Sequence, residues 1–426
     1  MREIEIKGSY YQTGFLTGIC HKNILKKIEE KVLKNLKIEN EKIKNYEKKL
    51  RNFQFLIEEI EGYCEGAEIK LENFLKIKLG NFDVPKLNCS SLFLSSKFVE
   101  NDVLCIMKIR DEKPLPQYIC KKINNGKIPY FFSGSISDIG YGFFIKENGF
   151  IGINNTGSFL KEDFINENGF DDCDIMRIVA EICNTPDEAI KIIEKMQKDK
   201  LIGYVGNKRG MIFLFSDRKN TIYVEINSFY LNYKKIYEKF CFTNDFLIDD
   251  SKKWFKNIET EGTKSSKKRK ERLEEILNEN EKFNVRKLIE ISRDKKNYPY
   301  SICRDTSLMP IRTISSFISF LYNEPILYIC IGNPYVSPYF PFYLKGNKII
   351  ENFINGDISI KLDSIYEKKK LLDEEYLNKI RKFEDGIIKM FKEIKDIEEK
   401  NLKVQREVLN FIIKGGKNEN LYNSRP

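Results

Sequence analysis

The sequence predicts a layered α+β protein, because helical and strand-like stretches come in blocks rather than in regular alternation. Residues 1–80 are predicted to be helical after a short extended start, since apolar side chains recur at steps of three and four. Residues 87–158 consist of short apolar runs separated by Asn-Asp, Asn-Asn-Gly and Glu-Asn-Gly turns, the pattern of strands and hairpins. Helix returns over 171–199, basic and then helical sequence fills 263–294, and strands are predicted again over 310–343. This order argues against a doubly wound parallel sheet, in which strands and helices alternate.

Local signals set boundaries within these blocks. Thr185 can cap a helix that starts at Pro186, because proline fits the first turn and the two acids after it suit the positive end of a helix. The runs M-I-F-L-F and T-I-Y-V-E-I are predicted to pair as a hairpin around residues 217–220. Near the N-terminus, Gly62 and Gly66 are expected to interrupt the helical pattern.

Residues 362–426 differ in kind, because their apolar positions alternate in steps of four and three, as in a heptad repeat. One helix is predicted to carry this seam, which consists of Tyr376, Ile380, Phe383, Ile387, Met390, Ile394 and Ile397. The pattern fits both an amphipathic helix docked on its own domain and a homodimer through the C-terminal helices. Docking is favoured, because only about three heptads are sustained and three to four are the minimum for a coiled coil.

Composition excludes several kinds of chemistry. The only histidine among the 426 residues is His21, so any Ser-His-Asp, Cys-His or multi-histidine metal mechanism must use that one residue. The ten cysteines are scattered, with no two at the spacing of a zinc knuckle or a redox pair, which predicts mostly buried, reduced thiols and no metal site. There is no glycine-rich phosphate loop of the Walker or dinucleotide type, and no cofactor is expected.

Charge and hydropathy favour a cytoplasmic protein without a nucleic-acid or membrane partner. Lys+Arg 73 against Asp+Glu 63 gives a net charge of +10, a mild excess for this length. The densest basic run, 264–272, is interpreted as a solvated loop leading into a helix at 273–277, and it lacks the interleaved aromatic residues of a nucleic-acid platform. The N-terminus has no apolar signal-peptide core, and the longest apolar stretch, 317–331, is interrupted by polar residues and a proline.

Cys89, in the run L-N-C-S-S, lies where the helical first part ends and the strand-rich part begins. The position alone favours a buried structural thiol. If the peptide bond before Cys89 were cleaved, its own α-amine, with a reference pKa of about 7.7 to 8.0, would be the base that thiol activation needs. A chain whose single histidine lies in another segment can therefore still have a cysteine nucleophile.

Motifs around Cys89 occur in a characteristic order between residues 8 and 344. They are G-S-Y-Y-Q-T-G-F-L-T-G, E-G-Y-C-E-G-A, N-C-S-S, I-M-K-I-R-D, I-K-E-N-G-F-I-G-I-N-N-T-G, C-F-T-N-D-F, Y-S-I-C-R-D, R-T-I-S-S-F-I and I-G-N-P-Y. In this order the chain resembles the acyl-coenzyme A:6-aminopenicillanate acyltransferase-like family of N-terminal-nucleophile (Ntn) hydrolases, related to penicillin V amidase and bile-salt hydrolase. The resemblance implies a four-layer αββα sandwich at 89–361, a helical pro-segment at 1–88 and, outside the resemblance, an amphipathic helical extension at 362–426.

The resemblance also implies roles for individual residues. Cys89 would be the nucleophile, Asp111 would orient the α-ammonium or the nucleophile, and Asn244 would donate to the oxyanion. An arginine is expected at the site, and Arg312 is ranked before Arg304 because it fits the spacing to G-N-P better. Further positions brought in by the matching motifs are Lys108, where relatives often carry arginine, and Asn148 and Asn154.

These residues imply a self-processing cysteine amidohydrolase or acyltransferase. It would cleave its own Asn88–Cys89 bond and act on linear amide C–N bonds or acyl thioesters of small molecules through an acyl-enzyme on Cys89. Two departures leave alternatives open: Asn88 replaces the family's usual glycine, and Asp305 stands where relatives often have histidine. The alternatives are a non-catalytic Ntn-fold scaffold and a basic-surface binding protein that uses the 264–272 run.

Overall fold

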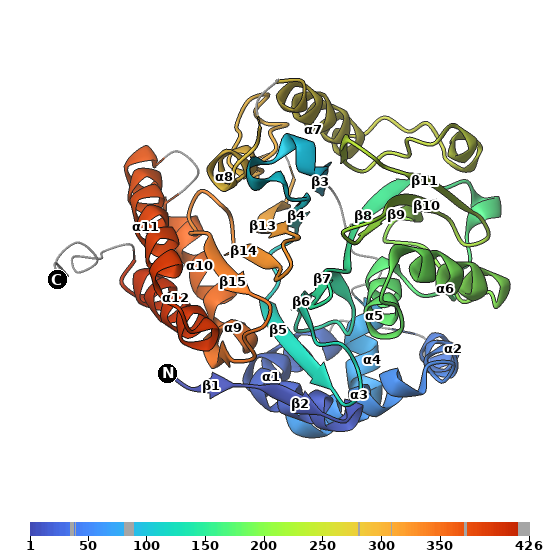
Figure 1. Ribbon diagram of the computed structural model, residues 1–426. Coiled ribbons are helices and arrows are strands. Elements are labelled where there is room, and N and C mark those ends of the chain that lie inside the picture. The colour runs from blue at the N-terminus through green and yellow to red at the C-terminus, as the bar shows by residue number, and fades with distance from the viewer. Residues whose placement is uncertain are drawn as a thin grey trace.

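The computed structural model has two large sheets at its centre, with helices around them (Figure 1). The residues that it describes are 1–34, 38, 40–80, 89–279, 282–307, 309–369 and 373–415. This mixed arrangement of helices and several sheets confirms the predicted α+β class in its broad form.

The larger sheet has eight strands, antiparallel except at one edge, where the N-terminal strand runs parallel to its neighbour. In spatial order its strands are β11 (Leu231–Lys235), β10 (Thr221–Ile226), β9 (Arg209–Ser216), β8 (Ile151–Phe159), β7 (Tyr141–Lys146), β6 (Tyr130–Ser135), β5 (Gln117–Asn124) and β2 (Ile6–Gly8). The predicted hairpin is confirmed, since Ser216 of β9 pairs with Thr221 of β10 across the turn at 217–220.

The smaller sheet has six antiparallel strands and carries the segment that follows Cys89. Its strands, in spatial order, are β12 (Lys239–Phe242), β3 (Ser90–Leu94), β4 (Cys105–Glu112), β13 (Arg312–Phe320), β14 (Ile326–Ile331) and β15 (Phe340–Tyr343). Aromatic contacts join the two sheets: Phe143 of β7 stacks on Phe317 of β13 with ring centroids 4.6 Å apart, and Phe131 of β6 contacts Phe342 of β15 at 5.4 Å. The apolar core therefore lies between the sheets.

Helices pack on the sheets and at their ends. They are α1 (Tyr10–Leu33), α2 (Asn40–Leu50), α3 (Gln54–Ala67), α4 (Leu71–Gly80), α5 (Asp172–Ile182), α6 (Pro186–Lys198), α7 (Glu261–Leu277), α8 (Val285–Ser292), α9 (Glu351–Ile354), α10 (Asp357–Lys369), α11 (Glu374–Glu393) and α12 (Ile397–Ile413). On the eight-stranded sheet, α5 contacts β7 and β8 and α6 contacts β9, whereas α7 contacts β12 and α8 contacts β13 of the other sheet. As predicted, Thr185 caps α6, its side chain accepting the Glu188 N–H, and Pro186 occupies the first turn.

The N-terminal segment is built into the sheets as well as being helical. A short strand, β1 (Glu3–Ile4), pairs with β16 (Ile349–Ile350), and β2 extends the eight-stranded sheet. Gly62 and Gly66 do not interrupt a helix as expected; they lie inside α3, because four glycines let α1 and α3 cross closely. A Cβ added at Gly18 of α1 would overlap the carbonyl oxygen of Tyr63, and one at Gly66 would overlap that of Phe15.

The basic run at 264–272 is part of α7, so its interpretation as a loop was wrong. Lysine and arginine are good helix formers, and Thr260 caps the helix by accepting the Thr263 N–H. Arg269, in the middle of the run, is fully buried. The run is therefore not one continuous solvated surface.

The C-terminal seam lies in two helices rather than one. The first ends at Glu393, and Asp396 caps the second by accepting the Glu399 N–H. The seam residues Tyr376 and Ile380 are buried, and Phe391 stacks on Tyr343 of β15 with ring centroids 4.8 Å apart. The helices dock on their own chain, as the favoured interpretation predicts.

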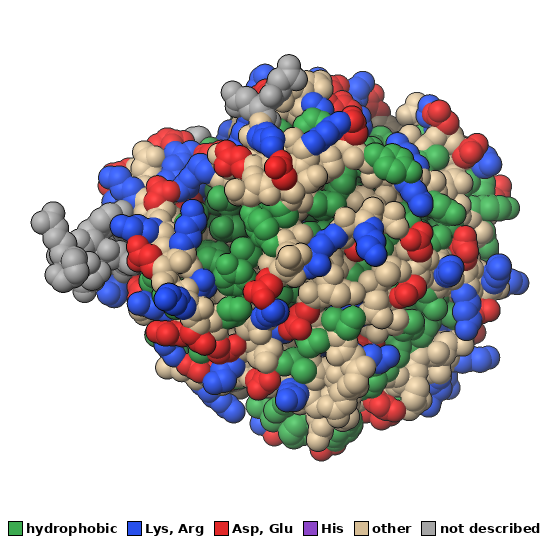
Figure 2. All heavy atoms as spheres, viewed as in Figure 1, with side chains coloured by type: hydrophobic (Ala, Val, Ile, Leu, Met, Phe, Trp, Pro, Cys, Tyr) green, Lys and Arg blue, Asp and Glu red, His purple; other side chains and the backbone are tan. Residues whose placement is uncertain are grey.

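The surface beside the docked C-terminal helices is hollowed on one face of the molecule. In Figure 2, hydrophobic side chains gather in a hollow beside the C-terminal helices, while acidic and basic side chains are interspersed over the rim. Among the described helices, none combines the length and the apolar character that a membrane crossing requires.

Candidate active site around Cys89

Cys89 directly precedes β3 and is half-buried. Its carbonyl oxygen accepts a hydrogen bond from Arg269 Nη1 at 2.7 Å, and the same nitrogen donates to Ser90 Oγ at 2.7 Å. Asn155 Nδ2 also donates to this carbonyl, at 3.5 Å. These contacts, together with the pairing of β3 between β12 and β4, fix the backbone at Cys89.

Asp111 and Arg304 form an incompletely bonded pair of charges close to Cys89. Asp111 Oδ1 accepts the Thr313 hydroxyl at 2.7 Å, whereas its buried Oδ2 has no hydrogen-bond partner among the described residues. Burial raises the pKa of Asp111 to about 6, although Arg269 and Arg304 oppose the shift. Arg304 is 1% exposed, and none of its three guanidinium nitrogens has a hydrogen-bond partner in the described part of the chain. Buried groups of this kind are costly unless a ligand or a chemical step uses them.

Lys108 lies beside the Cys89 thiol. Burial lowers the pKa of Lys108, and the neighbouring Cys89 opposes that shift. The lysine ammonium donates to the Asn154 carbonyl and, at 2.6 Å, to Asn155 Oδ1. Asn155 Nδ2 in turn donates to the Thr243 carbonyl at 2.7 Å. These hydrogen bonds hold the Lys108 ammonium of β4 against Asn154 and Asn155 of β8.

Asn244 is fully buried and reaches the Cys89 region through Arg269. Its Oδ1 accepts from Arg269 Nη2 at 2.9 Å, and its Nδ2 donates to the Thr156 carbonyl at 2.8 Å. One N–H of the amide group predicted to stabilise an oxyanion therefore donates to the backbone in this structure. The second N–H of Nδ2 can donate to a substrate without loss of that bond.

The contacts of Arg312 lead away from the thiol and toward the C-terminal extension. It opens β13 opposite Glu112 of β4, but its guanidinium binds Asp363 at 2.5 Å and Glu367 at 2.6 Å and lies 3.9 Å from the Tyr366 ring. The structure therefore brings together Cys89 and Asp111 with the other predicted residues, which are Lys108, Asn154, Asn244 and Arg304. The remaining predicted residue, Asn148, lies in the turn between β7 and β8, where its Nδ2 donates to the Asn184 carbonyl.

Arg269 is the site residue that the sequence analysis missed. It binds Cys89, Ser90 and Asn244 at once, and burial lowers its pKa to about 10. A signal for it was present: it shares one face of α7 with the buried residues Ser265, Leu273, Ile276 and Leu277. Helical periodicity therefore indicates that Arg269 points inward.

A small pocket opens beside these side chains. Most of the residues that line it are polar, and the full set is Cys89, Arg110, Asp111, Glu112, Gly142, Asn154, Thr156, Asp172 and Cys173. A carbonyl compound that enters here would meet one thiol at Cys89 and a second at Cys173. Cys173 is buried on α5, whereas Cys89 is half-buried.

Oxygen and sulfur ligand atoms also meet at the start of α5. Those of Asp171, Asp172 and Cys173 lie within 4.8 Å of one another. A lysine side chain already provides a positive charge to this cluster, because the Lys78 ammonium lies 3.2 Å from Asp171 Oδ2. The cluster is therefore better described as part of an ion-pair network than as a metal centre. Asn88, the predicted residue before the cleavage point, lies outside the described residues.

Comparisons with known proteins agree with the motifs. Residues 131–335 match the family described as acyl-coenzyme A:6-aminopenicillanic acid acyl-transferase, and no curated protein matches the chain. Among solved structures, a variant of the conjugated bile acid hydrolase from Clostridium perfringens has a TM-score of 0.40 and 13% identity, covering 62% of this chain and 97% of that chain. A second variant gives a TM-score of 0.37 and 12% identity over 61% and 95% of the two chains. An N-acylethanolamine-hydrolyzing acid amidase ortholog from Caenorhabditis elegans has a TM-score of 0.35 and 12% identity, over 54% and 92%. The family match over residues 131–335 thus confirms the resemblance predicted from the motifs.

Proposed function

We propose that the protein is a self-processing Ntn cysteine amidohydrolase or acyltransferase that uses Cys89 as its nucleophile. The observation that carries the proposal is the position of Cys89 at the head of β3, in a polar pocket that also contains the unbonded Oδ2 of Asp111. Among the described residues that oxygen has no hydrogen-bond partner, whereas cleavage before Cys89 would create an α-ammonium at another residue of the same pocket. The pocket is therefore better matched to a processed chain.

In self-processing, the Cys89 thiol adds to the Asn88 carbonyl carbon. The C–N bond to Cys89 breaks, the α-amine receives the thiol proton, and the acyl group moves to sulfur as a thioester. Water then hydrolyses the thioester, which releases the Asn88 carboxylate and regenerates the thiol. The product has its nucleophile and its base on one residue.

In turnover, the α-amine accepts the thiol proton while sulfur attacks the carbonyl carbon of an amide or an acyl thioester. The leaving amine or thiol departs with that proton, and the acyl-enzyme passes to water or to an acceptor amine. Lys108 and Arg269 would stabilise the negative charge that develops at the carbonyl oxygen. Asn244 would add the second N–H of its Nδ2, while the first remains bonded to the Thr156 carbonyl.

The finer architecture follows the same proposal. The layers follow the order helices, eight-stranded sheet, six-stranded sheet, helices, which supports a four-layer αββα Ntn sandwich over 89–361. In this proposal residues 1–88 are the pro-segment and residues 362–426 are an added helical unit. The substrate would be a small amide or thioester, and the site of action the cytoplasm. A homodimer through the C-terminal helices would have to use faces other than the seam, whose residues Tyr376 and Ile380 are buried within the chain.

One observation favours the non-catalytic scaffold as a second candidate. Asn88 stands where the family that the chain resembles usually has glycine before the nucleophile. A scaffold would keep the Asn88–Cys89 bond intact, whereas the proposed enzyme would cleave it.

Covalent labelling separates the two candidates. A small electrophilic amide analogue, such as a β-lactam, should acylate Cys89 in the wild-type protein and in Cys173→Ala, but not in Cys89→Ala. Cys173 is the matched control, because it lines the same pocket. Labelling that is unchanged by Cys89→Ala would contradict the proposed nucleophile.

A further inference from the structure

The N-terminal segment inserts a buried cation into the rest of the protein. Lys78 of α4 is 2% exposed, and its ammonium forms ion pairs with three carboxylates, those of Asp138 at 2.6 Å, Asp171 at 3.2 Å and Asp174 at 3.0 Å. A second group from the segment completes the contact, since the Tyr46 hydroxyl of α2 donates to Asp174 Oδ2 at 2.8 Å. Lys78 and its three carboxylates are referred to below as the Lys78 cluster.

The Lys78 cluster adjoins the wall of the Cys89 pocket. Asp171 caps α5 by accepting the Asp174 N–H at 2.9 Å, so two of the carboxylates fix the first turn of that helix. Between them lie Asp172 and Cys173, which line the pocket. Asp172 also accepts a hydrogen bond from Asn154 Nδ2 at 2.6 Å, and this bond connects the turn to the strand residue that binds Lys108.

The loop before β7 provides a second route from the cluster to the pocket. Asp138 Oδ1 accepts the Gly140 N–H at 3.0 Å as well as the lysine ammonium. Two residues further along, Gly142 lines the pocket. The position of Lys78 therefore influences two walls of the site, from α5 and from the β7 loop.

The electrostatics of the cluster require a cation. Burial lowers the pKa of Lys78, but the three carboxylates raise it, and the result lies well above the usual value. Burial and the neighbouring Asp171 raise the pKa of Asp174 to about 7, while Lys78 opposes that shift. Without the ammonium, buried carboxylates would face one another, and repulsion would be relieved only by proton uptake.

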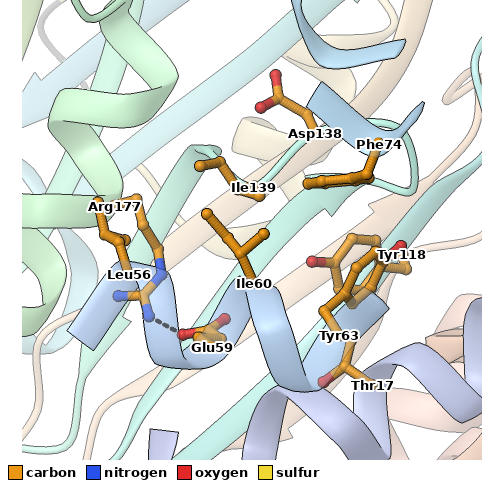
Figure 3. Close-up of a pocket in the computed structure, with 10 residues that line it drawn as sticks. All are labelled: Thr17, Leu56, Glu59, Ile60, Tyr63, Phe74, Tyr118, Asp138, Ile139 and Arg177. Atoms are coloured by element: carbon orange, nitrogen blue, oxygen red, sulfur yellow. Dashed lines mark hydrogen bonds and ion pairs between the residues drawn. The ribbon is translucent and has the colours of Figure 1, made fainter. Parts of the chain in front are cut away.

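Further contacts hold the N-terminal segment along α5. Figure 3 shows Glu59 of α3 paired with Arg177, one turn beyond Cys173, in the wall of a small pocket. Phe74 of α4 and Asp138 line the same pocket. The segment thus contacts α5 along its first two turns and is more than a cover over the cleavage point.

We propose that Lys78 is a positioning residue of the Cys89 site: its ammonium, supplied by the N-terminal segment, holds Asp138, Asp171 and Asp174 together and so sets the pocket walls formed by α5 and the β7 loop. This proposal rests on the proposed function, because the site that it positions is the one at which Cys89 acts. It implies that residues 1–80 are needed for catalysis after any cleavage at Cys89 as well as before it.

The test compares Lys78→Met with Lys76→Met, a substitution on the same helix in an exposed ion pair with Glu72. The readout is the second-order rate constant for labelling of Cys89 by iodoacetamide, per folded molecule, between pH 6 and pH 8.5. Lys78→Met should be labelled at least about tenfold more slowly than wild type at pH 8. The reason is that displaced pocket walls shift the groups that surround the Cys89 thiol. The ratio of variant to wild type should rise toward pH 6 as the carboxylates take up protons, and Lys76→Met should match wild type.

A purely structural role would give a different result. If Lys78→Met lowers the melting temperature but leaves the labelling rate and its pH dependence unchanged, the proposal is wrong. If Lys78→Met does not fold, Lys78→Met combined with Asp174→Asn removes one charge of each sign and replaces it as the test. Slow labelling of that double variant at pH 8 that recovers toward pH 6 would support the proposal, because Asp138 and Asp171 still face each other without the ammonium. Wild-type-like labelling, or slow labelling without pH dependence, would overturn it. Failure of the proposed function is seen separately, as wild-type labelling that does not depend on Cys89.

Discussion

Charged side chains are buried both in the Cys89 pocket and at the N-terminal interface, where Lys78 and Glu59 of the N-terminal segment contact the rest of the protein. The two regions differ in how completely these charges find ion-pair or hydrogen-bond partners. At the interface Lys78 has three carboxylates and Arg177 pairs with both Glu59 and Glu181. In the pocket one carboxylate oxygen of Asp111 and all three guanidinium nitrogens of Arg304 have no hydrogen-bond partner among the described residues.

This difference separates charges that hold the fold together from charges that await a reaction partner. A buried ion that is fully paired stabilises the arrangement around it once the chain has folded, and removing its partner is costly. A buried ion with an open bonding position destabilises the fold and is typical of a site where a new charge or ligand arrives. The two regions should therefore respond to substitution in opposite ways.

The largest expected effect on stability is at the interface. Arg177→Met should lower the free energy of unfolding by about 3–5 kcal/mol, because it leaves the buried Glu181 carboxylate and the partly buried Glu59 carboxylate without that partner. Urea denaturation at pH 7.5 measures the change. The control is Arg51→Met, which removes an exposed ion pair with Glu47 and should have no measurable effect. Equal stability of both variants would contradict a structural role for the interface charges.

In the pocket, Asp111→Asn should reduce activity in the processed enzyme and strengthen the fold of the uncut chain. Loss of the group that orients the α-ammonium should reduce kcat/KM about a hundredfold or more. In the uncut chain the folded-state pKa of Asp111 is about 6, above its unfolded value, so its contribution to stability is complete at low pH and is lost as pH rises through 6. In the Cys89→Ala background, which has no α-ammonium, Asp111→Asn should therefore stabilise the fold by about 1–3 kcal/mol at pH 7.5, and at pH 4 the difference should vanish.

The pH dependence of activity tests the same residue independently. Wild-type kcat/KM should fall on the acid side, since protonated Asp111 cannot bind the ammonium, and the apparent pKa should lie below the value of about 6 in the uncut chain, because the α-ammonium favours the carboxylate. Asp305→Asn, beside Arg304 in the sequence, is a matched control and should retain this limb. An acid limb that persists in Asp111→Asn would show that another group is responsible.

The smallest expected effects concern glycines within the helical segments. Gly18→Ala should cost about 1–3 kcal/mol, because its Cβ would overlap the Tyr63 carbonyl where α1 crosses α3. Gly386→Ala, in α11, has open space around the new Cβ and should stabilise by about 0.5–1 kcal/mol. Thermal denaturation of both variants measures the contrast. A neutral Gly18→Ala would mean that the two helices can separate without loss.

The two regions also differ in how far the sequence could predict them. Local patterns were sufficient for the α+β class, the cap at Thr185 and the hairpin at 217–220, because each depends on neighbours in the chain. Motif order was sufficient to propose Cys89 with Asp111. The partners of Lys78 could not be predicted, since Asp138 and Asp171 are far from it in sequence and meet it only after the helices have packed.

Wrong expectations came from reading composition without periodicity. Gly62 and Gly66 suggested a break, yet the close approach of α1 requires them inside a helix. The basic run suggested a solvated loop, yet Arg269 within it faces Cys89 and Asn244. In both cases tertiary contacts, which no local window contains, decide the role of the residue.

Cleavage before Cys89 would make this residue an N-terminal nucleophile, with its α-ammonium in the same pocket as Asp111. The intact mass of the purified protein under denaturing conditions tests this cleavage. Wild type should give two chains, separated between Asn88 and Cys89, and Cys89→Ala should give one uncut chain. A single uncut wild-type chain, identical in behaviour to Cys89→Ala, would contradict it.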